Sequence, residues 1–85
     1  MKRGELRRAI AARPASVRHQ ELCRLFEAYG WQRLRVTGSH YLYKKAGERP
    51  FPIPFHGSTV PPFIVRNALS LLPEEVDDED DDQEP

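Results

Sequence analysis

"WQRLRVTGSHYLYKK", residues 31–45, decides the fold because its side chains alternate in character with a period of two. Leu34 and Val36 fall on one face of the first half, and Arg33 and Arg35 fall on the other. This pattern predicts a strand that is covered on one side and basic on the opposite side.

A second strand follows the glycine at position 38, which permits a tight reversal of the chain. Ser39, Tyr41 and Tyr43 share one face of this strand, and His40, Leu42 and Lys44 share the other. Further along, the apolar residues of "FPIPF" (residues 51–55) alternate with Pro52 and Pro54. Both prolines remove backbone donors from the same edge, so this third strand must lie at the edge of the sheet.

Helical patterns flank the three strands. Leu22, Leu25, Phe26 and Tyr29 form an apolar stripe, and Gly30 stands where a left-handed helix end is expected. Ser16 is a possible N-cap for this helix, although residues 18–21 lack a clear capping box.

The closing helix carries an inner stripe of Val65, Ala68, Leu69 and Leu72, and Pro73 ends it. Ser58 or Thr59 can cap it, with the prolines that follow in its first turn. Residues 4–13 predict a further short basic helix that Pro14 closes. The order predicts an α+β fold: a two-layer α-β-β-β-α sandwich with a three-stranded antiparallel sheet, an extra N-terminal helix and both main helices on one face.

Charge is divided sharply along the 85 residues, although the formal net charge is zero. Residues 1–73 carry all thirteen Lys and Arg against four Glu, a net +9, while residues 74–85 carry nine acids and no base, a net −9. The basic part favours a phosphate-rich partner such as a nucleic acid. The acidic block cannot bury enough apolar surface to order itself, so it should be a disordered tail that either solubilises the protein or mimics RNA.

Several classes of protein find no support in the sequence. The single cysteine, Cys23, cannot form an internal disulfide, and neither a membrane span nor a secretion signal is indicated, which points to a cytoplasmic protein. His19 and Cys23 lie four apart on a helix, but no further ligand cluster supports a metal site, so we expect no metal or other cofactor. Neither a P-loop nor a serine nucleophile elbow is present.

Cleavage of RNA by histidine is chemically plausible. A ribose 2′-OH can attack its neighbouring phosphate without a metal ion if one group removes its proton and another protonates the leaving oxygen, and histidine suits both roles. Cations near His40 come from Arg33, Arg35, Lys44 and Lys45. His56 and Gly57 precede the last helix, where free N–H groups and the helix dipole favour a phosphate.

Two long segments carry a resemblance to a known family. "ELCRLFEAYGWQRLRVTGSHYLYKK" and "IPFHGSTVPPFIVRNAL" resemble the HicA toxins of bacterial type II toxin–antitoxin systems, small mRNA interferases with a double-stranded-RNA-binding-domain-like fold. The resemblance implies that residues 16–73 form the RNA-binding and ribonuclease domain, preceded by a basic extension (1–15) and followed by an acidic tail (74–85). It also implies a cognate HicB-like antitoxin as partner.

The resemblance implies one catalytic histidine, His40, which Gly38 and Ser39 position. His56 is a second candidate for proton transfer or phosphate binding. The remaining candidates for RNA contact are Arg33, Arg35, Ser39, Tyr41, Lys44, Lys45 and Gly57. Tyr41 either packs or stacks on a base. The competing functions are a metal-independent endoribonuclease toxin acting on mRNA, a noncatalytic RNA-binding module that uses the same surface, and a pure protein-interaction domain.

Overall fold

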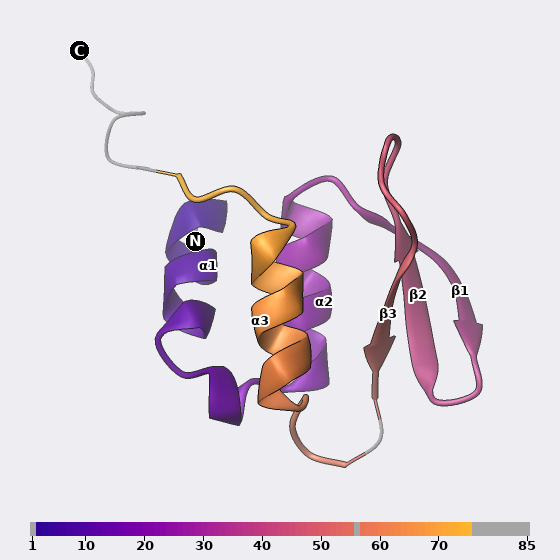
Figure 1. The fold of residues 1–85 in the computed structure, drawn as a ribbon, viewed down its shortest axis with the longest axis horizontal. Helices are drawn as coiled ribbons and strands as arrows, with labels where there is room; N and C mark the ends of the chain where they lie inside the picture. The colour runs from indigo at the N-terminus through magenta and orange to yellow at the C-terminus, as the bar shows by residue number, and fades with distance from the viewer. Residues whose placement is uncertain (1, 56, 76–85) are drawn as a thin grey trace.

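The computed structural model describes residues 2–55 and 57–75 and has the predicted α+β architecture. Figure 1 shows the helices gathered on one side of a three-stranded antiparallel sheet, with α1 farthest from the strands and α2 and α3 between. In chain order the elements are α1 (Arg3–Ala11), a 3₁₀ turn η1 (Pro14–Ser16), α2 (His19–Ala28), β1 (Gln32–Thr37), β2 (His40–Lys44), β3 (Phe51–Pro54) and α3 (Pro62–Ser70). In the described part of the chain, no helix is long and apolar enough to cross a membrane.

The apolar stripe of α2 forms the centre of the core, as the sequence predicts. Leu22, Leu25, Phe26 and Tyr29 are all at most 2% exposed. The rings of Trp31, Phe51 and Tyr43 surround the ring of Phe26. Helix α2 ends as predicted, with a positive φ of 90° at the glycine that follows it.

The predicted helix starts were wrong at both main helices. Ser16 belongs to η1, and the N-cap of α2 is Arg18, whose backbone N–H donates to the Glu21 carboxylate at 2.8 Å. The Arg13 guanidinium also donates to this carboxylate, and together these bonds hold the pKa of Glu21 below its usual range. Helix α3 is preceded by Pro61 as its N-cap, so neither Ser58 nor Thr59 caps it.

The sheet has the order β1-β2-β3, which confirms that β3 is an edge strand. Ile53 pairs with Tyr41, and the Phe55 N–H donates to the Ser39 carbonyl at 2.9 Å. The backbone N–H groups of alternate residues in a strand point to opposite edges. The nitrogens of Pro52 and Pro54 therefore face away from β2, and no hydrogen bond of the sheet is lost there.

A β-bulge in β1 overturns the predicted faces of that strand. Arg33 pairs with Tyr43 but Arg35 pairs with Leu42, so one extra residue stands between them. Leu34 and Val36 are not covered, as the sequence suggested, but 54% and 50% exposed. The physical reason is that β1 is the outer strand and all six of its residues lie at the surface.

Helix α1 is bonded to the C-terminal end of α3 through Arg7. The Arg7 guanidinium donates from Nε to the Leu72 carbonyl and from Nη2 to the Leu69 carbonyl, both at 2.8 Å. These carbonyls lie at the C-terminal end of α3, where backbone acceptors lack helical partners and a cation is favoured. Arg7 therefore joins α1 to the C-terminal end of α3.

Replacing Arg7 with alanine is expected to lower the free energy of unfolding by about 2 kcal/mol, because hydrogen bonds from a charged donor contribute more than neutral ones. Arg7→Lys should not restore the loss, since an ammonium group lacks the two-pronged geometry. Urea unfolding followed by circular dichroism measures the change. The control is Arg66→Ala on the exposed surface of α3, and equal midpoints for the two alanine variants would contradict the assignment.

Candidate functional site

His40 is the first residue of β2 and its side chain is exposed. The turn before it contains Gly38 with a φ of 57°, a conformation that residues with a side chain rarely adopt. Tyr41 faces the helices, where its ring lies 4.5 Å from that of His19. Neighbouring residues of a strand point to opposite faces, so His40 points away from the helices, to the face that no described element covers.

The bulge separates the two arginines that the sequence placed together. Arg35 lies opposite Leu42 and Thr37 lies opposite His40, so Arg35 shares the open face of the sheet with His40. Arg33 lies opposite Tyr43 on the helix side, and its guanidinium is 5.1 Å from the centre of the Tyr41 ring. Of these two arginines, Arg35 is therefore the one on the same face as His40.

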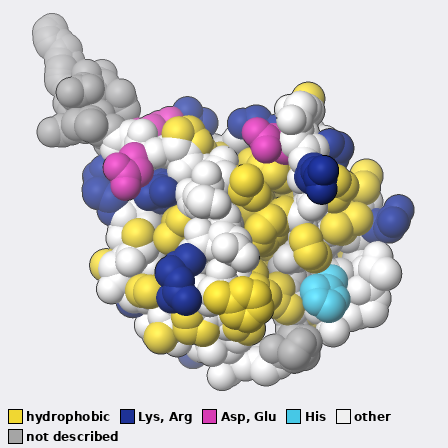
Figure 2. Space-filling view, viewed as in Figure 1, with side chains coloured by type: hydrophobic (Ala, Val, Ile, Leu, Met, Phe, Trp, Pro, Cys, Tyr) yellow, Lys and Arg dark blue, Asp and Glu magenta, His cyan; other side chains and the backbone are white. Residues whose placement is uncertain are grey.

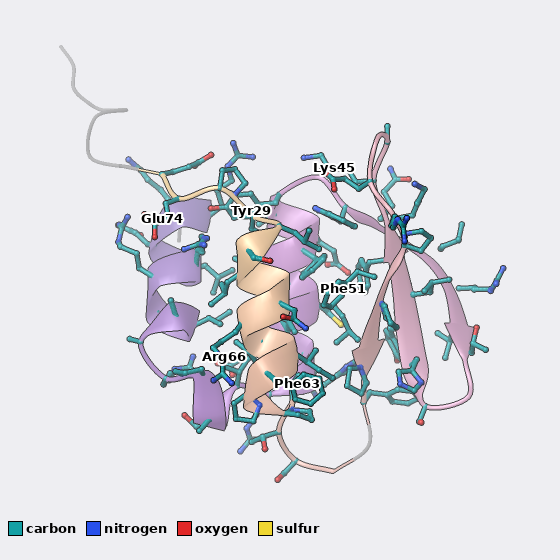
Figure 3. All side chains as sticks on the ribbon, in the orientation of Figure 1. Tyr29, Lys45, Phe51, Phe63, Arg66 and Glu74 are labelled. Atoms are coloured by element: carbon teal, nitrogen blue, oxygen red, sulfur yellow. The ribbon has the colours of Figure 1, made fainter. Side chains whose placement is uncertain are left out.

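The two lysines lie at the other end of β2. Lys44 is four residues from His40, about 13 Å at roughly 3.3 Å per residue. Its ammonium group donates to the backbone carbonyls of Lys45 and Glu48. The Lys45 ammonium donates to the Tyr29 carbonyl at 3.0 Å and so satisfies an acceptor at the end of α2 (Figure 3). The structure does not bring these lysines to the histidine.

The segment before α3 differs from the expected phosphate site. His56 lies outside the described residues. Gly57 is exposed with a φ of 82°, and α3 begins only at Pro62. The two prolines at the helix start have no N–H to offer, so this terminus presents fewer donors than the sequence suggested.

The surface carries basic side chains well beyond the sheet. Figure 2 shows Lys and Arg over both the helices and the strand side of one face. The acidic side chains where the chain leaves α3 lie among arginines of α1, and the carboxylate of Glu75 is 2.5 Å from the Arg3 guanidinium. The start of the acidic segment is thus held on the helical side of the protein.

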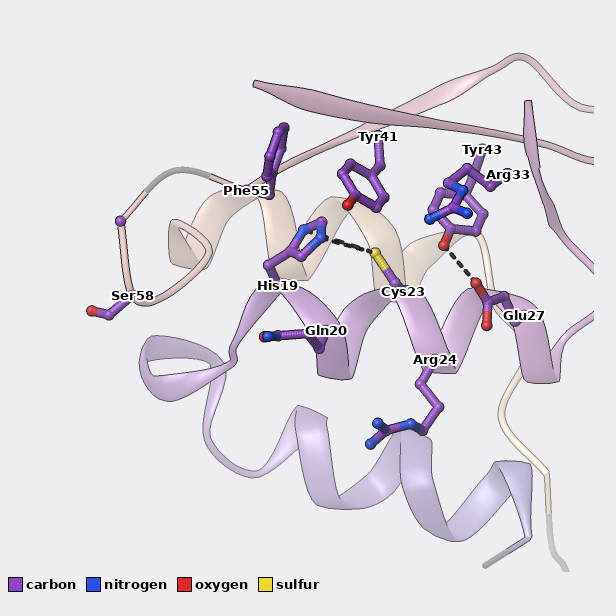
Figure 4. A pocket seen from close by; sticks show the side chains of 11 residues that line it. His19, Gln20, Cys23, Arg24, Glu27, Arg33, Tyr41, Tyr43, Phe55 and Ser58 are labelled. Carbon is purple, nitrogen blue, oxygen red and sulfur yellow. Dashed lines mark hydrogen bonds between the residues drawn. The ribbon is translucent and has the colours of Figure 1, made fainter. Parts of the chain in front are cut away.

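A hollow of about 470 Å³ lies between α2 and the helix-facing side of the sheet (Figure 4). Its α2 wall consists of His19, Gln20, Cys23, Arg24 and Glu27. These positions recur at four-residue intervals (19, 23, 27 and 20, 24), which places them on neighbouring lines of one helix face. We call this hollow the α2 pocket.

The strand wall of the α2 pocket is aromatic with one cation. Tyr41, Tyr43 and Phe55 line it together with Arg33. The rings of Tyr41 and Phe55 lie 4.7 Å apart, and both contact the ring of His19. Of these residues, Arg33 and Tyr41 were predicted from the sequence to contact RNA. The residues of the other wall were not predicted as a site, and the sign of them in the sequence is their four-residue spacing on α2.

His19 is a neutral, hydrogen-bonded histidine. Its Nδ1 lies 3.2 Å from the Pro54 carbonyl, which can only accept, so Nδ1 carries the proton. The Cys23 sulfur lies beside the ring, 3.6 Å from Nε2 and 3.8 Å from Nδ1. Burial lowers the pKa of His19, which keeps the ring uncharged near neutral pH.

Cys23 and Tyr43 are also uncharged. Burial raises the pKa of the Cys23 thiol. Burial and the hydrogen bond that the Tyr43 hydroxyl donates to Glu27 at 2.6 Å raise the pKa of Tyr43. Among the described residues, no three His, Cys, Asp or Glu side chains gather into a set that could hold a metal ion. His19, Cys23 and Tyr43 therefore add no charge to the α2 pocket. Neither the Cys23 thiol nor the Tyr43 hydroxyl is an activated nucleophile.

Comparison with known proteins identifies the chain's relatives at the family level. Residues 20–72, from the first turn of α2 to just beyond α3, match the family model described as the HicA toxin of bacterial toxin–antitoxin systems. No curated protein and no solved structure matches the chain.

Proposed function

Because this chain belongs to the HicA family of toxins of bacterial toxin–antitoxin systems, we propose that it is an endoribonuclease that cleaves mRNA without a metal ion. One observation carries the proposal. His40, the histidine of the glycine-serine-histidine motif, is exposed on an open sheet face that it shares with Arg35. An RNA strand can reach the imidazole there without any rearrangement of the described residues.

The proposed reaction uses the RNA's own 2′-OH as nucleophile. The oxygen attacks the adjacent phosphorus, the bond to the 5′ oxygen breaks, and the products are a 2′,3′-cyclic phosphate and a 5′-OH end. His40 moves a proton at one of these oxygens, and Arg35 stabilises the negative charge that grows on the phosphate. His56 is the candidate for the second proton transfer.

The other candidate residues contact RNA at different distances from the cut. Ser39 belongs to the turn beside His40, whereas Lys44 and Lys45 lie at the opposite end of β2. We assign the lysines to phosphates farther along the RNA strand, since roughly 13 Å of β2 at about 3.3 Å per residue separates Lys44 from His40. Arg33, Tyr41 and Gly57 face or border the α2 pocket.

We assign the cleaving domain to residues 16–73, with residues 1–15 as an extension that supports α3 and residues 74–85 as an acidic tail. The toxin–antitoxin family implies an antitoxin partner. We propose a HicB-like protein that covers the open sheet face, where Arg35 offers charge. An mRNA target places this activity in the cytoplasm.

A noncatalytic RNA-binding module is the second candidate. It is favoured by the basic side chains that lie over both the helices and the strand side of the face seen in Figure 2. This candidate predicts salt-dependent RNA binding and intact RNA, whereas a pure protein-interaction domain predicts no such binding.

The purified protein is expected to cut single-stranded RNA in the presence of EDTA and to leave the same RNA intact when every ribose is 2′-O-methylated. The reason is that the nucleophile belongs to the substrate and no metal ion participates. Gel analysis with end-group mapping measures both outcomes. Cleavage of the methylated RNA, or cleavage that EDTA abolishes, would refute the mechanism; binding without cleavage would favour the second candidate.

A further inference from the structure

We propose that the α2 pocket holds one unstacked base of the RNA substrate, next to the phosphate that His40 cleaves. The proposal rests on the proposed function and adds a recognition site that the cleavage chemistry itself does not require.

The pocket and His40 meet at the same end of the sheet. His40 pairs with Pro54 in β3, and the carbonyl of Pro54 contacts the ring of His19 in the pocket wall. Tyr41 follows His40 directly in β2, and its ring faces the pocket. A strand of RNA that passes around this end can therefore have its phosphate on the open face and a neighbouring base on the helix side.

The lining suits a planar ring that carries hydrogen-bonding edges. Tyr41, Phe55 and His19 form an aromatic cluster (Figure 4). The Arg33 guanidinium lies 5.1 Å from the centre of the Tyr41 ring. Aromatic rings and guanidinium planes are the groups on which unstacked RNA bases stack. The hollow of about 470 Å³ lies within the usual range of small-molecule sites.

The polar groups on the α2 wall can read the edge of a base. Gln20 brings an amide with donors and an acceptor, and Glu27 brings carboxylate oxygens, one of which accepts from Tyr43. The guanidinium groups of Arg24 and Arg33 supply positive charge for the attached phosphate. Because the other titratable side chains of the pocket are uncharged, these two cations outweigh the single carboxylate. The pocket therefore favours an anionic nucleotide over a neutral ring.

Binding of single nucleotides tests the pocket apart from cleavage. The probes are the four 5′-mononucleotides, added to full-length protein that carries His40→Ala so that no toxic cleavage occurs during preparation. We expect at least one nucleotide to shift the NMR signals of the Gln20 side-chain amide and the Tyr41 ring. Arg33→Ala should weaken this binding by about tenfold, in line with the loss of one stacking partner.

The matched control is Arg66→Ala, which removes the same charge from the surface of α3 and should change the affinity by less than roughly twofold. Gln20→Ala, an exposed substitution on α2, provides a second pocket variant if Arg33→Ala disturbs β1. The proposal is overturned if none of the four nucleotides shifts these signals. It is also overturned if Arg33→Ala and Arg66→Ala bind nucleotide with equal affinity and Gln20→Ala leaves the affinity unchanged.

The identity of the base beside each cut separates RNA recognition from binding of free nucleotides. With His40 intact, Arg33→Ala should broaden the base preference at the cleavage sites mapped by sequencing, while Arg66→Ala should leave it unchanged. An unchanged preference in Arg33→Ala and Gln20→Ala overturns the assignment to an RNA base. Nucleotide binding without any RNA cleavage supports the pocket and refutes the proposed nuclease, whereas cleavage without nucleotide binding does the reverse.

Discussion

Replacing His40 with alanine is expected to lower the rate of RNA cleavage by about 10²–10⁴-fold, the usual contribution of a positioned acid–base group. Binding of an uncleavable 2′-O-methylated RNA should change little, because the phosphate contacts come from Arg35 and other cations. The side chain is exposed at the start of β2, so its removal leaves no cavity. Single-turnover cleavage and fluorescence anisotropy measure the two quantities on the same protein. In cells, growth arrest on expression should disappear.

Thr37→Ala is the matched control, because Thr37 is the exposed cross-strand partner of His40 on β1. Its cleavage rate should stay close to that of the unaltered protein. Arg35→Ala should instead weaken RNA binding and reduce the salt dependence of the affinity by about one phosphate contact. The histidine mechanism would be refuted if cleavage were undiminished in the alanine variant at position 40 and also in a variant altered at both 40 and 56.

Phe26→Ala is expected to unfold the protein or bring it close to unfolding. The side chain is 0% exposed, and ring centres of Trp31, Phe51 and Tyr43 lie 4.9, 5.1 and 5.9 Å from its own. Losing a buried phenylalanine costs about 3–5 kcal/mol. A domain of this size has a total stability of roughly 4–13 kcal/mol, so the loss consumes a large part of it. Urea titration with tryptophan fluorescence measures the free energy of unfolding.

Leu34→Ala is the control for an apolar truncation outside the core. Leu34 is 54% exposed on the outer strand, and its removal should change the free energy of unfolding by no more than about 0.5 kcal/mol. If the Phe26 variant unfolded at the same urea concentration as the Leu34 variant, the aromatic cluster would not be the centre of the core.

Local patterns predicted most of the fold correctly. The stripe from Leu22 to Tyr29 is buried, the glycine after α2 has a positive φ, and the prolines of β3 lie at the edge of the sheet. Each of these features follows from residues close together in the chain, where spacing and backbone restrictions act directly. The family match over residues 20–72 agrees with the resemblance that the two long segments, residues 21–45 and 53–69, carry.

The candidate site was only partly predictable. The exposure of His40 follows from strand alternation once Tyr41 is known to face the helices. The α2 pocket was not foreseen, because its walls come from α2, β1, β2 and the segment after β3, which meet only in the folded chain. The ammonium groups of Lys44 and Lys45 bind backbone carbonyl groups. The alternation of side chains along a strand does not predict these bonds.

The sequence by itself determined the order and type of the helices and strands, the edge position of β3, and a basic domain followed by an acidic segment. Only the tertiary structure decided that Arg35 joins His40 on the open face while Arg33 turns to the α2 pocket. The reason is the bulge in β1: one extra residue reverses every later side chain of a strand, and its position is set by pairing with β2 rather than by the residues of β1.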